Sequence, residues 1–314
     1  MSLAGYGAAS SGAMCRQCQC INAVTSLIVT LATTWSTAMR LDVPIVNAPM
    51  GGAAGGRLAA AVSTAGGLGM VGMGSSATPE QLKAELAALG ELSRPFGIGL
   101  VHWVMQDRPE LLNMAVAARP ALLSVSFGAD WTWVAKAHDS GVRVATQVAT
   151  VEAARRAVDA GVDVVVARGA EGGGHGEPTV GTLPLLCDVL DAVDVPVLAA
   201  GGISSARGVA AVLAAGAAAA WVGTAFAACA EALTPEAARE ALLAADGDAT
   251  ELTSEYDVAA GYRWPASIPE RVLRGSPVNA GQGVGAVRRT VGAADVVGSL
   301  RDGAAALLGR WSAS

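Results

Sequence analysis

Short apolar runs alternate with longer alanine-rich segments along the chain from residue 43 onward. Short runs bounded by turn residues are typical of buried strands, and longer segments with helical apolar periodicity are typical of helices. The pattern predicts strands at 44–48, 68–72, 96–101, 121–127, 142–148, 162–167, 195–200 and 219–223. It predicts helices at 56–65, 79–89, 108–118, 130–140, 151–161, 182–193, 204–216 and 235–245.

Each predicted strand is followed by a helix, and this repeat indicates the fold class. The pairs Thr78-Pro79 and Thr234-Pro235 mark two helix starts, because a hydroxyl can cap the first turn and proline suits the first helical position. Eight strand–helix units predict an α/β fold of the (β/α)₈ TIM barrel type, whereas a doubly wound sheet usually has about five to seven strands.

The length of the chain suits one such domain with a short appendage. Its 314 residues exceed the roughly 250 that a barrel typically takes. We therefore divide the chain into an N-terminal extension outside the core at 1–39, the barrel at 40–246 and a C-terminal segment at 247–314 that packs on the barrel as a lid or flank.

Composition narrows the classes of partner. A formal net charge of -6, without any basic cluster interleaved with aromatic residues, argues against nucleic acid. Cys15, Cys18 and Cys20 crowd near the N-terminus without the His or fourth Cys that a zinc tetrahedron needs. We predict no metal and a reducing, cytoplasmic location. The oligomeric state stays open, with a homodimer as one option.

The stretch from residue 17 to residue 39 carries no charge. It has the apolar character of a signal peptide or a membrane anchor. Thr and Ser dilute it, however, and only Arg16 precedes it. These features favour a non-native extension or an upstream start, with Met39 opening the domain and no membrane partner.

Two glycine-rich strand ends predict a phosphate site. Phosphate commonly binds at the loops after strands seven and eight of such barrels. Strand seven ends in Gly201-Gly202, where backbone N–H groups can approach an anion near a helix N-terminus. Strand eight ends in Gly223-Thr224, which adds a hydroxyl donor. Dinucleotide and Walker-type phosphate motifs are absent from the sequence, so a compact ligand such as FMN is favoured.

A third motif follows strand six, where three glycines precede His175. Glycines allow main chain to approach a ligand closely, and the strand end places the histidine at the mouth of the barrel. Histidine exchanges a proton near neutral pH, so it can serve as base or donor. The sequence gives no such setting to His102 or His138, which we interpret as loop or helix-surface residues.

These motifs together resemble the nitronate monooxygenase family, once called 2-nitropropane dioxygenases. The resemblance covers about residues 40–311. The wider superfamily of this family includes flavin-dependent enoyl-acyl-carrier-protein reductases and NADH:quinone reductases. It is carried by Pro49-Met50-Gly51-Gly52, the loop 171–175, the stretch 200–203, Gly223-Thr224, and the tail motifs Tyr256-Asp257, 261–265 and 271–274.

The resemblance implies a role for each matching position. Pro49, Met50 and Gly51 would lie against the flavin ring, and Gly99 and Gln147 would contact the ring or the ribityl chain. The FMN phosphate would be held by Gly173, Gly174, Gly201, Gly202, Gly223 and Thr224. His175 would face substrate as the catalytic residue.

The chain departs from the family pattern at four other positions in or beside these motifs. Gly172 replaces a common alanine, Ala225 replaces an arginine after strand eight, and Gly275 replaces an asparagine in the tail. Arg168 stands where Gln or Glu is frequent. Its side chain would either stabilise a reduced, anionic flavin or point to solvent.

The resemblance implies an FMN-dependent monooxygenase that oxidises alkyl nitronates or nitroalkanes with O₂ to a carbonyl compound and nitrite. The flavin would carry the redox step, and His175 would remove the substrate proton. Two alternatives stay open: an NAD(P)H-dependent reductase of enoyl thioesters or quinones, and a non-catalytic FMN-binding barrel. The physiological substrate is not specified, although Trp103, Trp131 and Trp133 suit either an aromatic pocket wall or core packing.

Overall fold

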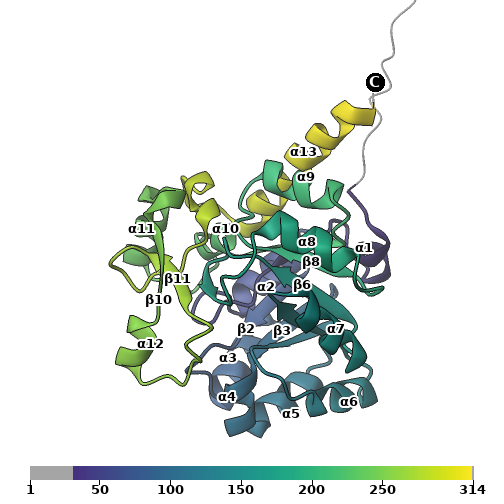
Figure 1. Ribbon diagram of the computed structural model, residues 1–314, viewed down its shortest axis with the longest axis vertical. Coiled ribbons are helices and arrows are strands. Elements are labelled where there is room, and N and C mark those ends of the chain that lie inside the picture. The colour runs from purple at the N-terminus through teal and green to yellow at the C-terminus, as the bar shows by residue number, and fades with distance from the viewer. Residues whose placement is uncertain (1–30, 313–314) are drawn as a thin grey trace, which may run out of the picture.

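The computed structural model describes residues 31–312, which contain a barrel of eight parallel strands surrounded by helices (Figure 1). The barrel strands are β1 (Ile45–Asn47), β2 (Gly69–Gly72), β3 (Phe96–Val101), β4 (Leu122–Ser126), β5 (Arg143–Val148), β6 (Val164–Arg168), β8 (Val197–Ala200) and β9 (Ala219–Val222). They follow the order β1-β9-β8-β6-β5-β4-β3-β2, and a bridge from Val46 to Leu68 completes the circle. The predicted (β/α)₈ barrel is confirmed.

Helices follow the strands as predicted, and they cover the outside of the barrel. They are α2 (Gly56–Thr64), α3 (Pro79–Leu89), α5 (Pro109–Ala117), α6 (Thr132–Asp139), α7 (Val151–Asp159), α8 (Thr182–Leu190), α9 (Ala206–Ala214) and α11 (Glu236–Ala244). Thr78 caps α3 as predicted. The predicted cap at Thr234 is wrong, because Pro235 has extended ψ and is itself the N-cap residue of α11.

Side chains alternate between two apolar layers along each strand, as the strand period of two requires. Val164 and Val166 point into the barrel, where they pack in one cluster with Met70 and Leu198. Val165, between them, belongs to the cluster formed with the outer helices. The small, branched side chains fill the barrel, so its lumen is a packed core.

The helix α1 (Thr34–Ala38) closes the N-terminal end of the barrel. Thr33 and Ser36 form a capping box, and the Thr33 hydroxyl also donates to Ala218 O at 2.7 Å. Trp35 and Met39 are buried in the same cluster as the barrel interior. Part of the stretch assigned to the extension at 1–39 therefore packs on the core, while the three N-terminal cysteines lie outside the described residues.

The first half of the C-terminal part flanks the mouth of the barrel, in green in Figure 1. Its elements are β10 (Thr250–Thr253), α12 (Glu255–Ala260) and β11 (Glu270–Leu273), while α13 (Ala293–Ser312), in yellow, packs on the outer helices α9 and α2. β10 and β11 form an antiparallel sheet with β7 (Gly174–His175), which comes from the loop after β6. β11 pairs with β7 so that Glu270 stands opposite His175. Among the residues from 31 to 312, no helix combines the length and the apolar character needed to cross a lipid bilayer.

We expect Gly69→Ala to unfold the barrel more easily, because a Cβ at Gly69 would lie 1.8 Å from the Ala59 carbonyl oxygen of α2. Overpacking against backbone costs about 1–3 kcal/mol of unfolding free energy, which urea denaturation measures. The matched control is Gly298→Ala on α13, where a Cβ meets nothing within 4 Å. That change should stabilise the helix by about 0.5–1 kcal/mol. Equal stability of the two variants would contradict the prediction.

Candidate active site

A cavity of about 500 Å³ lies at the C-terminal ends of the barrel strands. This is the size of pocket that holds a cofactor or small ligand. The predicted site residues that line it are Pro49, Met50, Gly51, Gln147, Gly173, Gly174, His175, Gly201, Gly202, Gly223 and Thr224. The structure therefore brings together eleven of the twelve predicted positions.

The twelfth position, Gly99, supports the cavity from behind. A Cβ at Gly99 would lie 2.3 Å from the Pro49 ring, so this glycine lets the loop after β1 rest on β3. Gly72 does the same for Met50, and Gly74 packs against Gly51 at backbone distance. These close contacts hold the loop 49–51 against the strand ends without large side chains.

The loops after β8 and β9 lie together at the place where the sequence predicts a phosphate cup. Gly201 and Gly202 have φ values of 117° and 67°, a region in which a side chain is strained. The Thr224 oxygen accepts a hydrogen bond from the Gly281 N–H at 3.0 Å, so its own hydroxyl hydrogen can still be donated to a ligand. The cup thus offers small residues and a free donor to an anion.

Arg168, the last residue of β6, is buried in the wall of the cavity with 4% of its surface exposed. Its Nη2 donates to the carbonyl oxygens of Gly172, Gly173 and Gly174. Burial lowers the pKa of Arg168 to about 10, with a further contribution from the charge of Arg271. The reading in which Arg168 points to solvent is wrong, because the loop after β6 folds over the guanidinium.

Two buried polar atoms in residues of the cavity wall have no partner within the described chain. They are Arg168 Nη1 and the Thr234 hydroxyl oxygen. Buried polar groups are nearly always hydrogen-bonded in folded proteins. These two atoms are exceptions, and because they have almost no accessible surface they lie inside the wall and do not face the space that a ligand would fill.

His175 is paired with a buried carboxylate. Its Nε2 lies 2.8 Å from Asp257 Oδ2 of α12, and the two side chains are 15% and 7% exposed. Burial lowers the pKa of His175, and the hydrogen bond and charge of Asp257 oppose that shift. The lowered pKa favours the neutral imidazole, with Nε2 held by Asp257 and Nδ1 left for a ligand.

Trp264 forms an aromatic wall beside the histidine. Its ring stacks on His175 with centroids 3.6 Å apart and planes 9° apart, and its Nε1 donates to Ser75 Oγ at 2.9 Å. Phe127 and Trp103 meet it edge to face at 5.0 and 5.9 Å. Trp264 thus fastens the C-terminal segment to the barrel loops while it fixes the plane of the histidine ring.

Glu270 completes a group of three ionisable side chains. Ligand atoms of His175, Asp257 and Glu270 all lie within 4.8 Å of one another. Burial, followed by the charge of Asp257, raises the pKa of Glu270 to about 7, while a hydrogen bond from Asn279 lowers it. The predicted absence of a metal stays a prediction, although these three residue types can ligate one.

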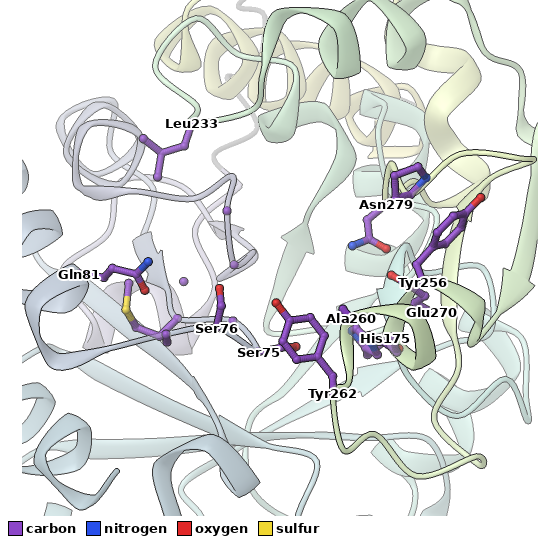
Figure 2. Close-up of a pocket in the computed structure, with 18 of the residues that line it drawn as sticks. Ser75, Ser76, Gln81, His175, Leu233, Tyr256, Ala260, Tyr262, Glu270 and Asn279 are labelled. Carbon is purple, nitrogen blue, oxygen red and sulfur yellow. Dashed lines mark hydrogen bonds and ion pairs between the residues drawn. The ribbon is translucent and has the colours of Figure 1, made fainter. Parts of the chain in front are cut away.

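A second cavity of about 440 Å³ adjoins the first and shares His175 with it. Figure 2 shows Ser76 and Gln81 of the barrel on one side of this space and Tyr256 and Asn279 of the C-terminal segment on the other. The histidine therefore lies where the cofactor-sized cavity meets an approach route from outside.

Sequence reasoning missed the roles of Asp257, Trp264, Glu270 and Asn279 in this site. Asp257 and Trp264 stand in tail motifs that are shared with the resembling family, and that sharing was the available signal. Glu270 and Asn279 follow no recognisable motif. His102 was expected at the surface, but it is 5% exposed and its Nε2 lies 3.1 Å from Asp130 O.

A sequence model of the family described as nitronate monooxygenase matches residues 33–113 and 109–262, well over half of the chain. The chain belongs to the nitronate monooxygenase family. It is thereby an oxidoreductase of a flavin-dependent family, and the spans that match include the strand-end loops and His175–Asp257 pair described above.

Relatives named for different reactions resemble this chain about equally. The nitronate monooxygenase of Pseudomonas aeruginosa is 33% identical over 276 residues, which covers 73% of this chain and 78% of the relative. A (3aS,4S,5R,7aS)-5-hydroxy-7a-methyl-1-oxo-octahydro-1H-indene-4-carboxyl-CoA dehydrogenase of Rhodococcus jostii is also 33% identical, over 84% of this chain and 72% of the relative.

A solved structure supports the same fold. The nitroalkane oxidase from Streptomyces ansochromogenes superimposes with a TM-score of 0.75 at 28% identity, and the match covers 89% of this chain and all of that chain. The match therefore includes both the barrel and the segment that flanks its mouth.

We expect Glu270→Gln to change how stability depends on pH. The folded pKa of Glu270, about 7, is above its usual value near 4.5, so the wild type loses stability as the pH rises from 4.5 through 7. Glutamine does not titrate and avoids this loss. The difference in unfolding free energy between the variant and the wild type should be about 1–2 kcal/mol more favourable to the variant at pH 8 than at pH 4. This value allows for the partial solvation of the carboxyl.

Urea denaturation at the two pH values measures this difference. The control is Glu240→Gln, which alters an exposed carboxylate on α11 and should leave the pH dependence unchanged. A Glu270→Gln curve parallel to that of the wild type would show that the carboxyl is not perturbed.

Proposed function

We propose that this protein is an FMN-dependent nitronate monooxygenase, which oxidises alkyl nitronates or nitroalkanes with O₂ to a carbonyl compound and nitrite. The observation that carries the proposal is a buried, carboxylate-paired histidine in the wall of a cavity that the glycines after β8 and β9 also line. A base and a phosphate cradle in one cavity suit a flavin enzyme that acts on a carbon acid.

The residues present fit FMN as the cofactor. The cup at Gly201, Gly202 and Thr224 would hold the phosphate, and the loop 49–51 would lie beside the ring. Bound FMN would supply the redox chemistry by accepting electrons from the substrate and passing them to O₂.

His175 would act as the base for neutral nitroalkanes. Its lowered pKa favours the unprotonated form, and Nδ1 can accept the proton from the carbon that bears the nitro group. Asp257 holds the tautomer in which Nε2 carries the proton and stabilises the imidazolium that forms, at 2.8 Å. Alkyl nitronates have already lost this proton and need no base.

The surrounding side chains suit a small, apolar substrate. Trp264 and Phe127 line the cavity with aromatic surface, which excludes water and packs alkyl groups. The stacking of Trp264 on His175 also limits rotation of the imidazole. Substrate would therefore meet a base of fixed direction in an apolar surrounding.

A second candidate function is the dehydrogenation of a hydroxylated acyl-CoA, favoured by the relative from Rhodococcus jostii. The His175–Asp257 pair could equally take a proton from a hydroxyl group. The approach route, however, is lined by the carboxylates Glu85, Asp257 and Glu270 and by no cationic side chain. This lining opposes the phosphates of coenzyme A at that mouth, so the nitronate reaction is favoured.

We expect nitronates to reduce the protein-bound flavin without oxygen, because the proposed reaction delivers electrons from the substrate to the cofactor. The measurement is anaerobic stopped-flow absorbance with 2-nitropropane nitronate, NADH and a β-hydroxyacyl-CoA in parallel. Rapid bleaching by the nitronate supports the proposal. Bleaching by NADH or by the acyl-CoA, with none by the nitronate, would overturn it in favour of a reductase or a dehydrogenase.

We expect His175→Ala to lower activity on neutral nitroalkanes much more than activity on nitronates. Loss of the base should lower kcat/KM for neutral nitroalkanes by about 10²–10⁴, whereas turnover of the preformed nitronate should change by less than about tenfold. Steady-state oxygen consumption with each form measures the split. His138→Gln, at an exposed helix position, is the control and should alter neither value. Equal losses on both substrates would contradict a base role.

A further inference from the structure

Arg168 is a buried cation whose charge is only partly balanced. Within the described chain it forms no salt bridge. The charge of Glu171 acts on it, but the Glu171 carboxylate accepts hydrogen bonds from the Thr182 N–H and hydroxyl at 2.7 and 2.6 Å. Nη2 is bonded to backbone carbonyls, and Nη1 is buried without a partner. A buried guanidinium without a paired anion is costly, so this side chain favours negative charge in the adjoining cavity.

The loop after β6 is shaped to hold this side chain. A Cβ at Gly172 would lie 2.7 Å from Arg168 Nε, and a Cβ at Gly176 would lie 2.4 Å from Arg168 Cζ. Gly172 and Arg168 are both positions where the chain departs from the family pattern. Gly172 stands where alanine is common, and Arg168 stands where Gln or Glu is frequent. The two departures are thus parts of one feature, since the arginine needs the glycine beside it.

The position of the guanidinium indicates which part of a ligand it meets. The carbonyl oxygens of residues 172–174 converge on Nη2, and such oxygens repel a phosphate. The phosphate cup lies instead after β8 and β9. Arg168 contacts the residue directly before His175, so it stands at the reacting end of the cavity.

We propose that Arg168, from the wall of the cavity beside His175, stabilises by its charge the negative charge that the ring of the bound flavin gains on reduction. This inference rests on the proposed FMN site. Gly172 and Gly176 keep the space for the guanidinium, and the carbonyls of the loop fix its direction. The result is a flavin that accepts electrons more readily than one placed beside glutamine, because a nearby positive charge favours the anionic form.

The test compares Arg168→Gln, Gly172→Ala and the double variant as FMN-bound proteins. Arg168→Gln should make the midpoint potential of the flavin more negative and weaken sulfite binding by about tenfold, the scale of a lost interaction between two charges near a buried site. Sulfite is the probe because its addition places negative charge on the oxidised ring. Arg207→Gln removes an exposed arginine and should change neither quantity.

Gly172→Ala should shift both quantities in the same direction by displacing the guanidinium. In the Arg168→Gln background the added methyl group should have no further effect, since the crowded atoms are gone. This pair of results separates a role of the arginine from a general disturbance of the loop. Should Arg168→Gln lose its flavin, Gly172→Ala carries the test with the same expected shifts.

Different failures have different meanings. A wild-type protein that binds no flavin overturns the proposed function and this inference together. A flavin-bound Arg168→Gln protein with unchanged potential and sulfite affinity overturns the inference alone. Weaker binding of FMN, with unchanged binding of riboflavin and an unchanged potential, would also overturn it by assigning Arg168 to the phosphate.

Discussion

The backbone pairing between β7 and β11 is the constraint on which the active site depends. It joins two residues of a barrel loop to a strand that follows nearly a hundred positions later in the chain, with His175 opposite Glu270. Without this pairing the histidine would sit on a glycine-rich loop with no fixed direction. The same pairing brings α12 close enough for Asp257 to bond the imidazole.

Close backbone approach is the second requirement of the site. The loop after β1 rests on Gly72 and Gly99, where a Cβ would clash, and on Gly74, where it would be tightly crowded. The loop after β6 needs glycine for another reason, because it wraps a buried arginine. The chain therefore uses glycine in some places to bring main chain together and in others to leave room for one large side chain.

The barrel was predictable because its strands and helices each carry their own local signal. The predicted strands agree with the observed ones within two residues, since apolar runs and turn residues mark each unit independently. The glycines after strands seven and eight were predictable for a related reason, because glycine motifs at strand ends have one place in a barrel. The positions at Pro49, Met50 and Gln147 came from the resemblance to the family. Gly99, which came from it too, shows the limit, because a small residue can contact a neighbouring loop instead of lining the cavity.

The partners of His175 could not be predicted in the same way. Asp257 and Glu270 reach the histidine through a small sheet built from segments far apart in the sequence, and no short-range pattern encodes such a pairing. The burial of Arg168 was equally hidden, because it results from three carbonyl groups that converge only after the loop has folded. Residue type alone left that side chain undecided between cavity and solvent.

The division of the site along the chain has an evolutionary consequence. The glycine loops that form the cofactor-sized cavity all precede residue 225, whereas the carboxylates and the tryptophan around His175 all follow residue 256. Mutations in the second part of the gene can therefore diversify the chemistry offered to a substrate while the first part is preserved under purifying selection. Relatives that share the barrel yet carry different reaction names are the outcome that such a partition favours.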